Sequence, residues 1–105
     1  LEGFMKGYSG RITAIVGMMA DKSCDEALSI LIPHCKNTVT VRVKENPRAM
    51  SEAELLKITS KYCKNSFSAD DYDEAIVKAR KLSNGEPIFI FGSLYLASAI
   101  REKLL

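Results

Sequence analysis

The stretch PIFIFGSLYL, residues 87–96, decides the fold of this chain. Its apolar run over 88–91 predicts a buried strand, and Gly92-Ser93 predicts a tight turn at which a helix over 94–104 opens. Free backbone N–H groups and a hydroxyl meet where a strand ends in Gly-Ser at a helix N-terminus. Such a point suits a phosphate or a carboxylate, so the stretch predicts a strand–turn–helix unit with an anion-facing turn.

Outward from this stretch, strand and helix patterns alternate along the chain. Strands are expected over 11–17, 38–43, around Phe67 and over 88–91, and helices over 24–34, 51–63, 70–82 and 94–104. This alternation predicts an α/β, Rossmann-like three-layer domain, with a mostly parallel sheet and helices on both faces. The strand over 38–43 has one polar side, which places it nearer an edge of the sheet.

Local signals mark several helix ends. Ser51-Glu52-Ala53-Glu54 has the spacing of a capping box, so Ser51 is expected to cap the helix that follows it. Asn84-Gly85 predicts a left-handed end to the helix over 70–82. The inner face of that helix is expected to carry Tyr72, Ala75, Ile76 and Ala79.

Composition indicates one ordinary globular domain that fills residues 1–105. The chain is 47% hydrophobic and 27% charged, which is ordinary for a globular protein. Its net charge is only +2 and its basic residues are spread along the sequence, so composition does not indicate a nucleic-acid partner. No apolar run reaches the roughly 20 residues of a membrane span, and no secretion signal is recognisable. Three cysteines without CxxC spacing and a single histidine predict reduced thiols in a cytoplasmic protein and no metal site.

Three polar loops follow predicted strands. They cover residues 17–23, 46–49 and 92–93, and in a parallel sheet they share the edge outside which ligands bind. That edge is expected to carry the candidate ligand-binding residues Asp21, Lys22, Arg48 and Ser93. The two cations and the helix N-terminus at Ser93 would suit a phosphate or a carboxylate.

Each of these four residues also has a structural interpretation. Ser93 is an N-cap in either case, and Asp21 has the residue type that braces a loop. Lys22 is open to interpretation as a solvated cation, and Arg48 as the ion-pair partner of Glu45 or Glu52. No carboxylate pair, nucleophile–base pair or metal cluster stands out, so no catalytic residue is expected in this chain alone.

Residues 17–23, residues 46–50 followed by Glu54-Leu55, and residues 91–97 resemble the C-terminal domain of the folylpolyglutamate synthases and dihydrofolate synthases. These enzymes belong to the Mur ligase family. The three segments occur in the family's order, and the resemblance covers nearly the whole chain. The Gly-Ser-Leu-Tyr-Leu segment is the most specific of them, and the Asp-Lys loop is the next.

The resemblance implies a domain that docks on an N-terminal ATP-binding domain of the same chain. ATP, with Mg²⁺, activates a folate carboxyl as an acyl phosphate, and the amine of L-glutamate displaces the phosphate. Family roles transfer to Asp21, Lys22 and Ser93, and less firmly to Arg48. They place the Ser93 turn on the active-site cleft and Lys22 toward phosphate or glutamate.

The same resemblance implies that parts of the enzyme lie elsewhere. The Gly-rich phosphate loop and the metal ligands belong to the N-terminal domain, so this chain alone is expected to be inactive and to bind no cofactor. The chain starts at Leu1 rather than Met, which predicts a piece of a longer protein, although removal of a tag would also give this start. The resemblance implies that the first strand of the domain and most of its first helix are missing. A sheet edge opened in this way is expected to favour dimerisation or strand exchange.

Two alternatives remain open. One is a non-enzymatic, doubly wound domain that binds a small anion or a partner protein. The other is a different amino-acid ligase of the same superfamily, such as one that builds peptidoglycan or a polyamino acid. The sequence also leaves open whether dihydrofolate synthase activity is present, which folate is preferred and how long a tail is made.

Overall fold

The computed structural model describes residues 11–20, 24–44 and 47–92. Strands and helices alternate along them, with one turn of 3₁₀ helix, η2, after the first helix. The elements are β1 (Ile12–Gly17), α2 (Cys24–Leu31), η2 (Ile32–His34), β2 (Cys35–Thr40), α3 (Glu52–Tyr62), β3 (Ser66–Ser68), α4 (Tyr72–Ser83) and β4 (Ile88–Gly92). The helix predicted over 94–104 lies outside the described residues.

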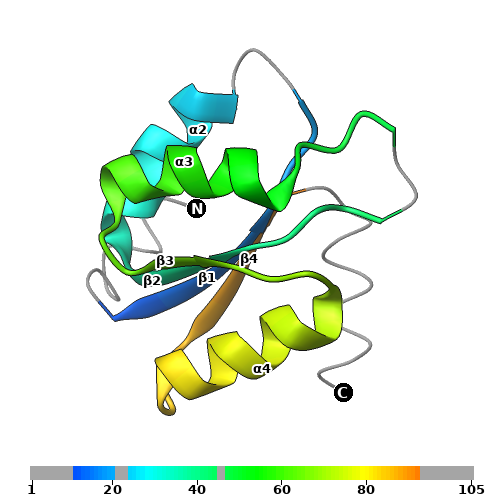
Figure 1. Cartoon of the computed structure of the whole chain (residues 1–105). Coiled ribbons are helices and arrows are strands. Elements are labelled where there is room, and N and C mark those ends of the chain that lie inside the picture. Colours follow the sequence, from blue (N-terminus) through cyan, green and yellow to red (C-terminus); the bar gives the residue numbers. More distant parts are fainter. Residues whose placement is uncertain (1–10, 21–23, 45–46, 93–105) are drawn as a thin grey trace.

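The strands form one sheet in the order β3-β2-β1-β4, and all three pairings are parallel. Helices α2 and α3 cover one face of the sheet, and α4 covers the other (Figure 1). The predicted three-layer α/β architecture is therefore confirmed. None of the described helices has both the length and the apolar composition that crossing a membrane requires.

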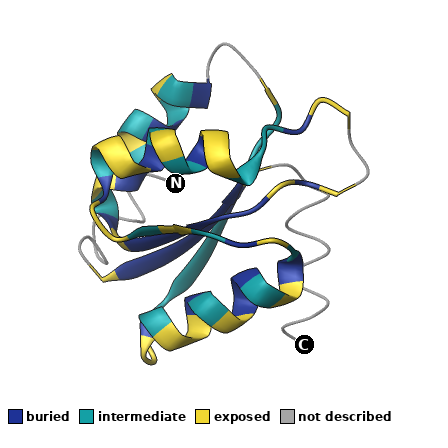
Figure 2. Ribbon diagram, in the orientation of Figure 1, coloured by how far each residue is buried: buried dark blue, intermediate teal, exposed yellow. Residues whose placement is uncertain are grey.

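The two faces of the sheet build two separate hydrophobic cores. Ile12, Ala14 and Val16 of β1 pack with α2 and α3, whereas Ile15 packs on the side of α4. Every residue of β1 is buried, as the dark blue of its ribbon shows (Figure 2). Helices on both faces explain why both sides of this strand are largely apolar.

Strand β2 differs from its prediction in extent and in position. The expected strand over 38–43 starts three residues earlier, at Cys35, and ends at Thr40. It is also an interior strand, because the short β3 pairs on its outer side. The alternation of apolar and polar residues that suggested an edge strand extends beyond the end of β2. Val41 and Val43 are still buried after the strand ends, while Arg42 between them is exposed.

Helix ends follow the local signals. The Ser51 hydroxyl accepts a 3.2 Å hydrogen bond from the Glu54 N–H at the start of α3, which confirms the predicted cap. Asp71 caps α4 in the same way, with Glu74 N–H donating over 2.8 Å. Asn84 ends α4 in the left-handed region, at φ 47° and ψ 47°, as predicted. The four residues expected on the inner face of α4 are all buried.

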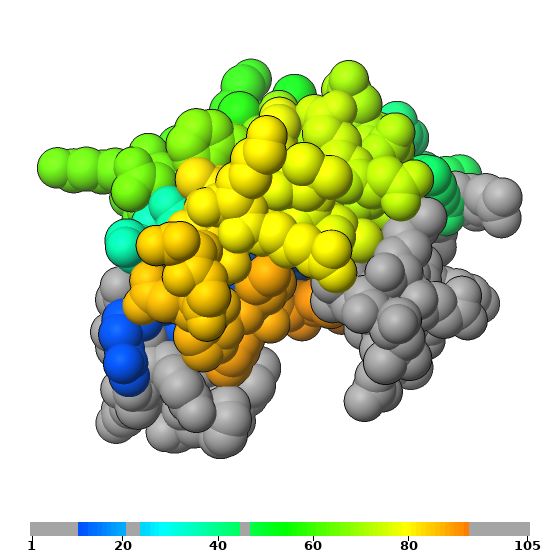
Figure 3. Space-filling model, turned by 90° about the horizontal axis from the view of Figure 1, so that it is seen from below, coloured from blue at the N-terminus to red at the C-terminus, as the bar shows by residue number. Residues whose placement is uncertain are grey.

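Strand β4 is less enclosed than β1. Ile88, Phe89 and Ile90 are only partly buried, and Figure 3 shows β4 (orange) reaching the surface beside α4 (yellow). Phe91 is buried against the α2 and α3 face, with its ring edge-to-face to Phe89 at 6.3 Å between centroids.

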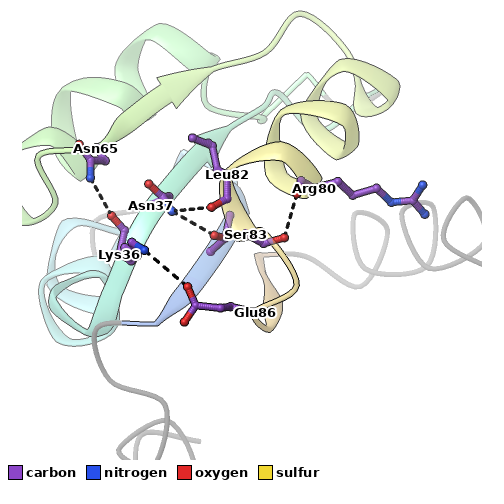
Figure 4. A network of polar contacts seen from close by, with 8 residues as sticks. Lys36, Asn37, Asn65, Arg80, Leu82, Ser83 and Glu86 are labelled. Atoms are coloured by element: carbon purple, nitrogen blue, oxygen red, sulfur yellow. Dashed lines mark hydrogen bonds and ion pairs between the residues drawn. The ribbon is translucent and has the colours of Figure 1, made fainter.

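A buried amide joins the sheet to the last turn of α4. Asn37 Nδ2 in β2 donates to the Leu82 carbonyl and to Thr13 Oγ1, each over 3.3 Å (Figure 4). Helix carbonyls in the last turn lack partners within the helix, so this amide supplies one from the sheet. The polar Asn37 is thereby accommodated in an interior strand.

Replacing Asn37 by Ala should lower the free energy of unfolding by about 1–3 kcal/mol, because Leu82 O and Thr13 Oγ1 lose a buried donor. Urea denaturation followed by circular dichroism measures the change. Asn65→Ala is the matched control, since its Nδ2 donates to Lys36 O at an exposed site and its loss should cost less than about 0.5 kcal/mol. Equal losses in the two variants would contradict this role for Asn37.

Candidate functional site

The direction of chain progression reverses between β1 and β4. From β1 the chain runs outward to β2 and β3 by way of α2 and α3, and α4 then returns it across the opposite face to β4. Strand β4 pairs with the other side of β1. In open parallel sheets, ligands bind outside the carboxyl ends of the strands at such a reversal. The topology therefore points to the ends of β1 and β4.

Both strands end in glycine at that point. Gly17 and Gly92 are register partners in the parallel pairing of β1 with β4. Gly92 has φ 146°, a backbone conformation that residues with a side chain rarely adopt. Gly92 is exposed, whereas Gly17 is buried. A strand end without a side chain allows a ligand or another backbone to approach closely, which is one reason for glycine at such a position.

The loops after β1 and β2 are joined directly. Met19 and Ala49 form an antiparallel bridge, in which Ala20 N–H donates to Arg48 O over 2.6 Å and Met50 N–H donates to Met18 O over 2.9 Å. This bridge confirms that these two loops lie at the same edge of the sheet, and the Gly17–Gly92 pairing brings the end of β4 to that edge as well.

The methionines of this edge anchor it to both cores. Met18 packs against the cluster under α2 and α3, and Met19 packs against the cluster under α4. Consecutive residues of an extended segment point to opposite sides, so the two side chains straddle the end of the sheet. The first loop is thus held by packing as well as by the bridge.

One of the four candidate ligand-binding residues lies within the described part of the chain. Arg48 is exposed and sits in the bridge, with its carbonyl bound to Ala20 N–H. Asp21, Lys22 and Ser93 lie outside the described residues; Asp21 follows Ala20 in the sequence, and Ser93 follows Gly92. Sequence reasoning missed the Gly17–Gly92 pair, because the two glycines are 75 positions apart and only strand pairing unites them.

A cluster of ionisable side chains lies between α2 and α3. Asp25 accepts hydrogen bonds from Lys61 Nζ at 2.8 Å and from Tyr62 OH at 2.7 Å. The bond from Lys61, with that from Tyr62, lowers the pKa of the Asp25 carboxyl below its ordinary 3.8. The bond to Asp25 likewise raises the pKa of Lys61 and the pKa of Tyr62. These shifts favour the carboxylate of Asp25 and the protonated forms of Lys61 and Tyr62 at neutral pH. The cluster therefore joins two helices and is not suited to proton transfer.

Cys24, Cys35 and Cys63 are buried, and none of them forms a disulfide. Burial, with a smaller effect of nearby Cys63, raises the pKa of the Cys35 thiol to about 12. A thiol nucleophile acts as the thiolate, so Cys35 is unsuited to covalent chemistry at neutral pH. Among the described residues, no group of three His, Cys, Asp or Glu side chains could hold a metal ion.

Comparison with known proteins gives one family. The family model described as Mur ligase, glutamate ligase domain, matches residues 1–94. A folylpolyglutamate synthase from Lacticaseibacillus casei is 35% identical over 98 residues, which cover 93% of this chain and 22% of that enzyme.

Solved structures share the fold. A Mycobacterium tuberculosis folylpolyglutamate synthase complexed with ADP superposes with a TM-score of 0.74 and 17% identity, covering 92% of this chain and 24% of that one. The folylpolyglutamate synthase of Thermotoga maritima gives a TM-score of 0.67 and 21% identity, over 94% and 22% of the two chains. The chain thus spans about a quarter of the length of these relatives.

The stability that Asp25 adds should be lost in acid. Its folded pKa is lowered, so the contribution is present above the ordinary value of 3.8 and disappears as the pH falls through the lower folded value. The melting temperature of Asp25→Asn should therefore lie below that of the unmodified chain at pH 6, and the gap should close toward pH 2. Asp70→Asn, at an exposed position, is the charge-matched control. A gap that stays constant with pH would contradict this contribution.

The Cys35 thiol should resist modification in the folded chain. At pH 8 a pKa of about 12 leaves a thiolate fraction roughly a thousandfold smaller than the ordinary value of 9.0 allows. Labelling with iodoacetamide, followed by mass spectrometry of Cys35 peptides, should be slow in buffer and rapid in urea. Rapid labelling of the folded chain would show that Cys35 is accessible and ionised.

Proposed function

Since the chain belongs to the Mur ligase, glutamate ligase domain family, we propose that it is the C-terminal domain of an ATP-dependent ligase that adds L-glutamate to folate. The observation that carries the proposal is the ligand-facing edge, where the glycine ends of β1 and β4 meet the bridge that bears Arg48. An exposed cation beside open strand ends suits the anionic groups of this reaction, which are phosphate and carboxylate.

The reaction proceeds through an acyl phosphate of the folate carboxyl, which the amine of glutamate attacks with release of phosphate. ATP supplies the phosphoryl group when it is bound, and Mg²⁺ offsets the charge of its phosphates. Arg48, with Lys22 and the Ser93 turn, orients the anionic groups and stabilises the charge that develops during transfer. Asp21 belongs to the same proposed set of ligand-binding residues. No metal ligand is assigned to the described residues.

The partner of this edge is an N-terminal ATP-binding domain of the same longer chain. Closure of the two domains excludes water that would otherwise hydrolyse the acyl phosphate. The ADP complex of the Mycobacterium tuberculosis relative supports a nucleotide-dependent reaction. The three buried free thiols support a reducing, cytoplasmic location.

The direct test is a ligation assay on the longer protein that contains residues 1–105, run beside this chain alone. Tetrahydrofolate or dihydropteroate is supplied with ATP and L-glutamate, and phosphate release and product mass are measured. Activity of the longer protein only would support the proposal. A longer protein inert with both pteridines would sink the folate assignment and favour a non-enzymatic anion-binding domain or a ligase with another substrate.

In the active longer protein, Arg48→Ala and Lys22→Ala should each lower kcat/KM for ATP or for glutamate by about 10- to 100-fold. Each substitution removes a positive side chain that is proposed to stabilise the anionic reacting groups. Lys36→Ala is the matched control, since Lys36 pairs with Glu86 over 3.5 Å at the opposite end of the sheet. An unchanged kcat/KM for both ATP and glutamate would show that the tested cation does not belong to the site.

A further inference from the structure

We propose that Tyr72 is a positioning residue for the loop that carries Arg48. The inference rests on the proposed function, because it gives a purpose to the position of Arg48. The tyrosine begins α4 just after β3 ends, at the edge of the sheet where the strands end, and its hydroxyl contacts the backbone of the segment that leads from β2 toward Arg48.

The segment after β2 leaves the sheet in steps. Val41 N–H still donates to Val16 O over 2.9 Å, and the side chains of Val41 and Val43 remain buried. At Lys44 the chain turns toward solvent, and there the Lys44 N–H donates to the Tyr72 hydroxyl over 2.8 Å. The Lys44 ammonium also lies 5.0 Å from the centroid of the Tyr72 ring, within range of a cation–π contact.

Tyr72 is held firmly enough to act as an anchor. It is the first residue of α4, directly after the N-cap Asp71, and the residue is only 5% exposed. The ring packs in the same core cluster as Val41, Val43 and Ala49. The hydroxyl therefore stands at a point determined by the helix and the core rather than by the loop.

The segment between β2 and α3 carries Arg48, and the residues before and after Arg48 contact different parts of the fold. Tyr72 ties the part before Arg48, at Lys44, to α4, and the bridge between Met19 and Ala49 ties the part after it to the end of β1. Arg48 directly precedes the bridged Ala49. Its place relative to the strand ends thus depends on both ties, one of which is a single hydroxyl.

Removing that hydroxyl should loosen the loop without unfolding the domain. Lys44 is exposed, so water can satisfy its N–H when the hydroxyl is absent, and the ring of Tyr72→Phe still fills the core. Tyr62→Phe is a matched control. It deletes a hydroxyl that donates to Asp25 over 2.7 Å between α2 and α3, away from this loop.

Amide hydrogen exchange on the 105-residue chain tests the positioning role without any assay of function. In Tyr72→Phe, exchange at Lys44 and at the bridge donors Ala20 and Met50 should accelerate about tenfold, while the amides of β1 keep their protection. Tyr62→Phe should leave all three amides unchanged. Acceleration confined to Lys44, with Ala20 and Met50 as slow as in the unmodified chain, would overturn the proposal.

Kinetics of the longer ligase test the link to Arg48. Tyr72→Phe should lower kcat/KM about tenfold for the same substrate that Arg48→Ala affects, and the double variant should be no worse than Arg48→Ala alone. Independent, multiplying losses, or a fully active Arg48→Ala variant, would overturn that link. If the longer protein ligates no glutamate, the proposed function fails, and the exchange experiment still decides the role of Tyr72.

Discussion

Burial of β1 on both faces is the constraint on which the rest of the structure depends. The strand pairs with β2 on one side and β4 on the other, so its backbone is satisfied within the sheet. Its side chains alternate between the core under α2 and α3 and the core under α4. Because an apolar strand of this kind must be covered twice, helices are required on both faces and the connections must cross from one face to the other.

The two ends of the sheet are built for different purposes. At the amino ends of the strands, Asn37 joins β2 to the last turn of α4, and Lys36 pairs with Glu86 (Figure 4). Within the described part of the chain, no buried side-chain nitrogen or oxygen lacks a hydrogen-bond partner. At the carboxyl ends, β1 and β4 end in paired glycines, and a bridge joins the loops that follow β1 and β2. The first end stabilises the domain, and the second is the end at which we propose that a ligand binds.

This division agrees with the proposed place of the domain in a larger ligase. The chain spans about a quarter of the length of the relatives that it matches, and its described residues hold no group of three His, Cys, Asp or Glu side chains that could bind a metal ion. Under the proposed function, this domain would supply cations to a cleft that another domain completes. The position of each cation would then matter as well as its presence, which is why the contacts that hold the segment before and after Arg48 are of interest.

Local features of this protein were determined by the sequence alone. Capping at Ser51, the left-handed end at Asn84 and the buried face of α4 follow from interactions within a few residues, and they were predicted correctly. The parallel α/β class and the shared edge of the loops after β1 and β2 also followed, whereas the ligand-binding roles of Asp21, Lys22, Arg48 and Ser93 remain predictions. Only the tertiary structure decided the extent of β2, the burial of Asn37, the pairing of Gly17 with Gly92 and the contact of Tyr72 with Lys44. Each of these joins residues far apart in the chain, and a polar residue can be buried only when another element supplies its partner.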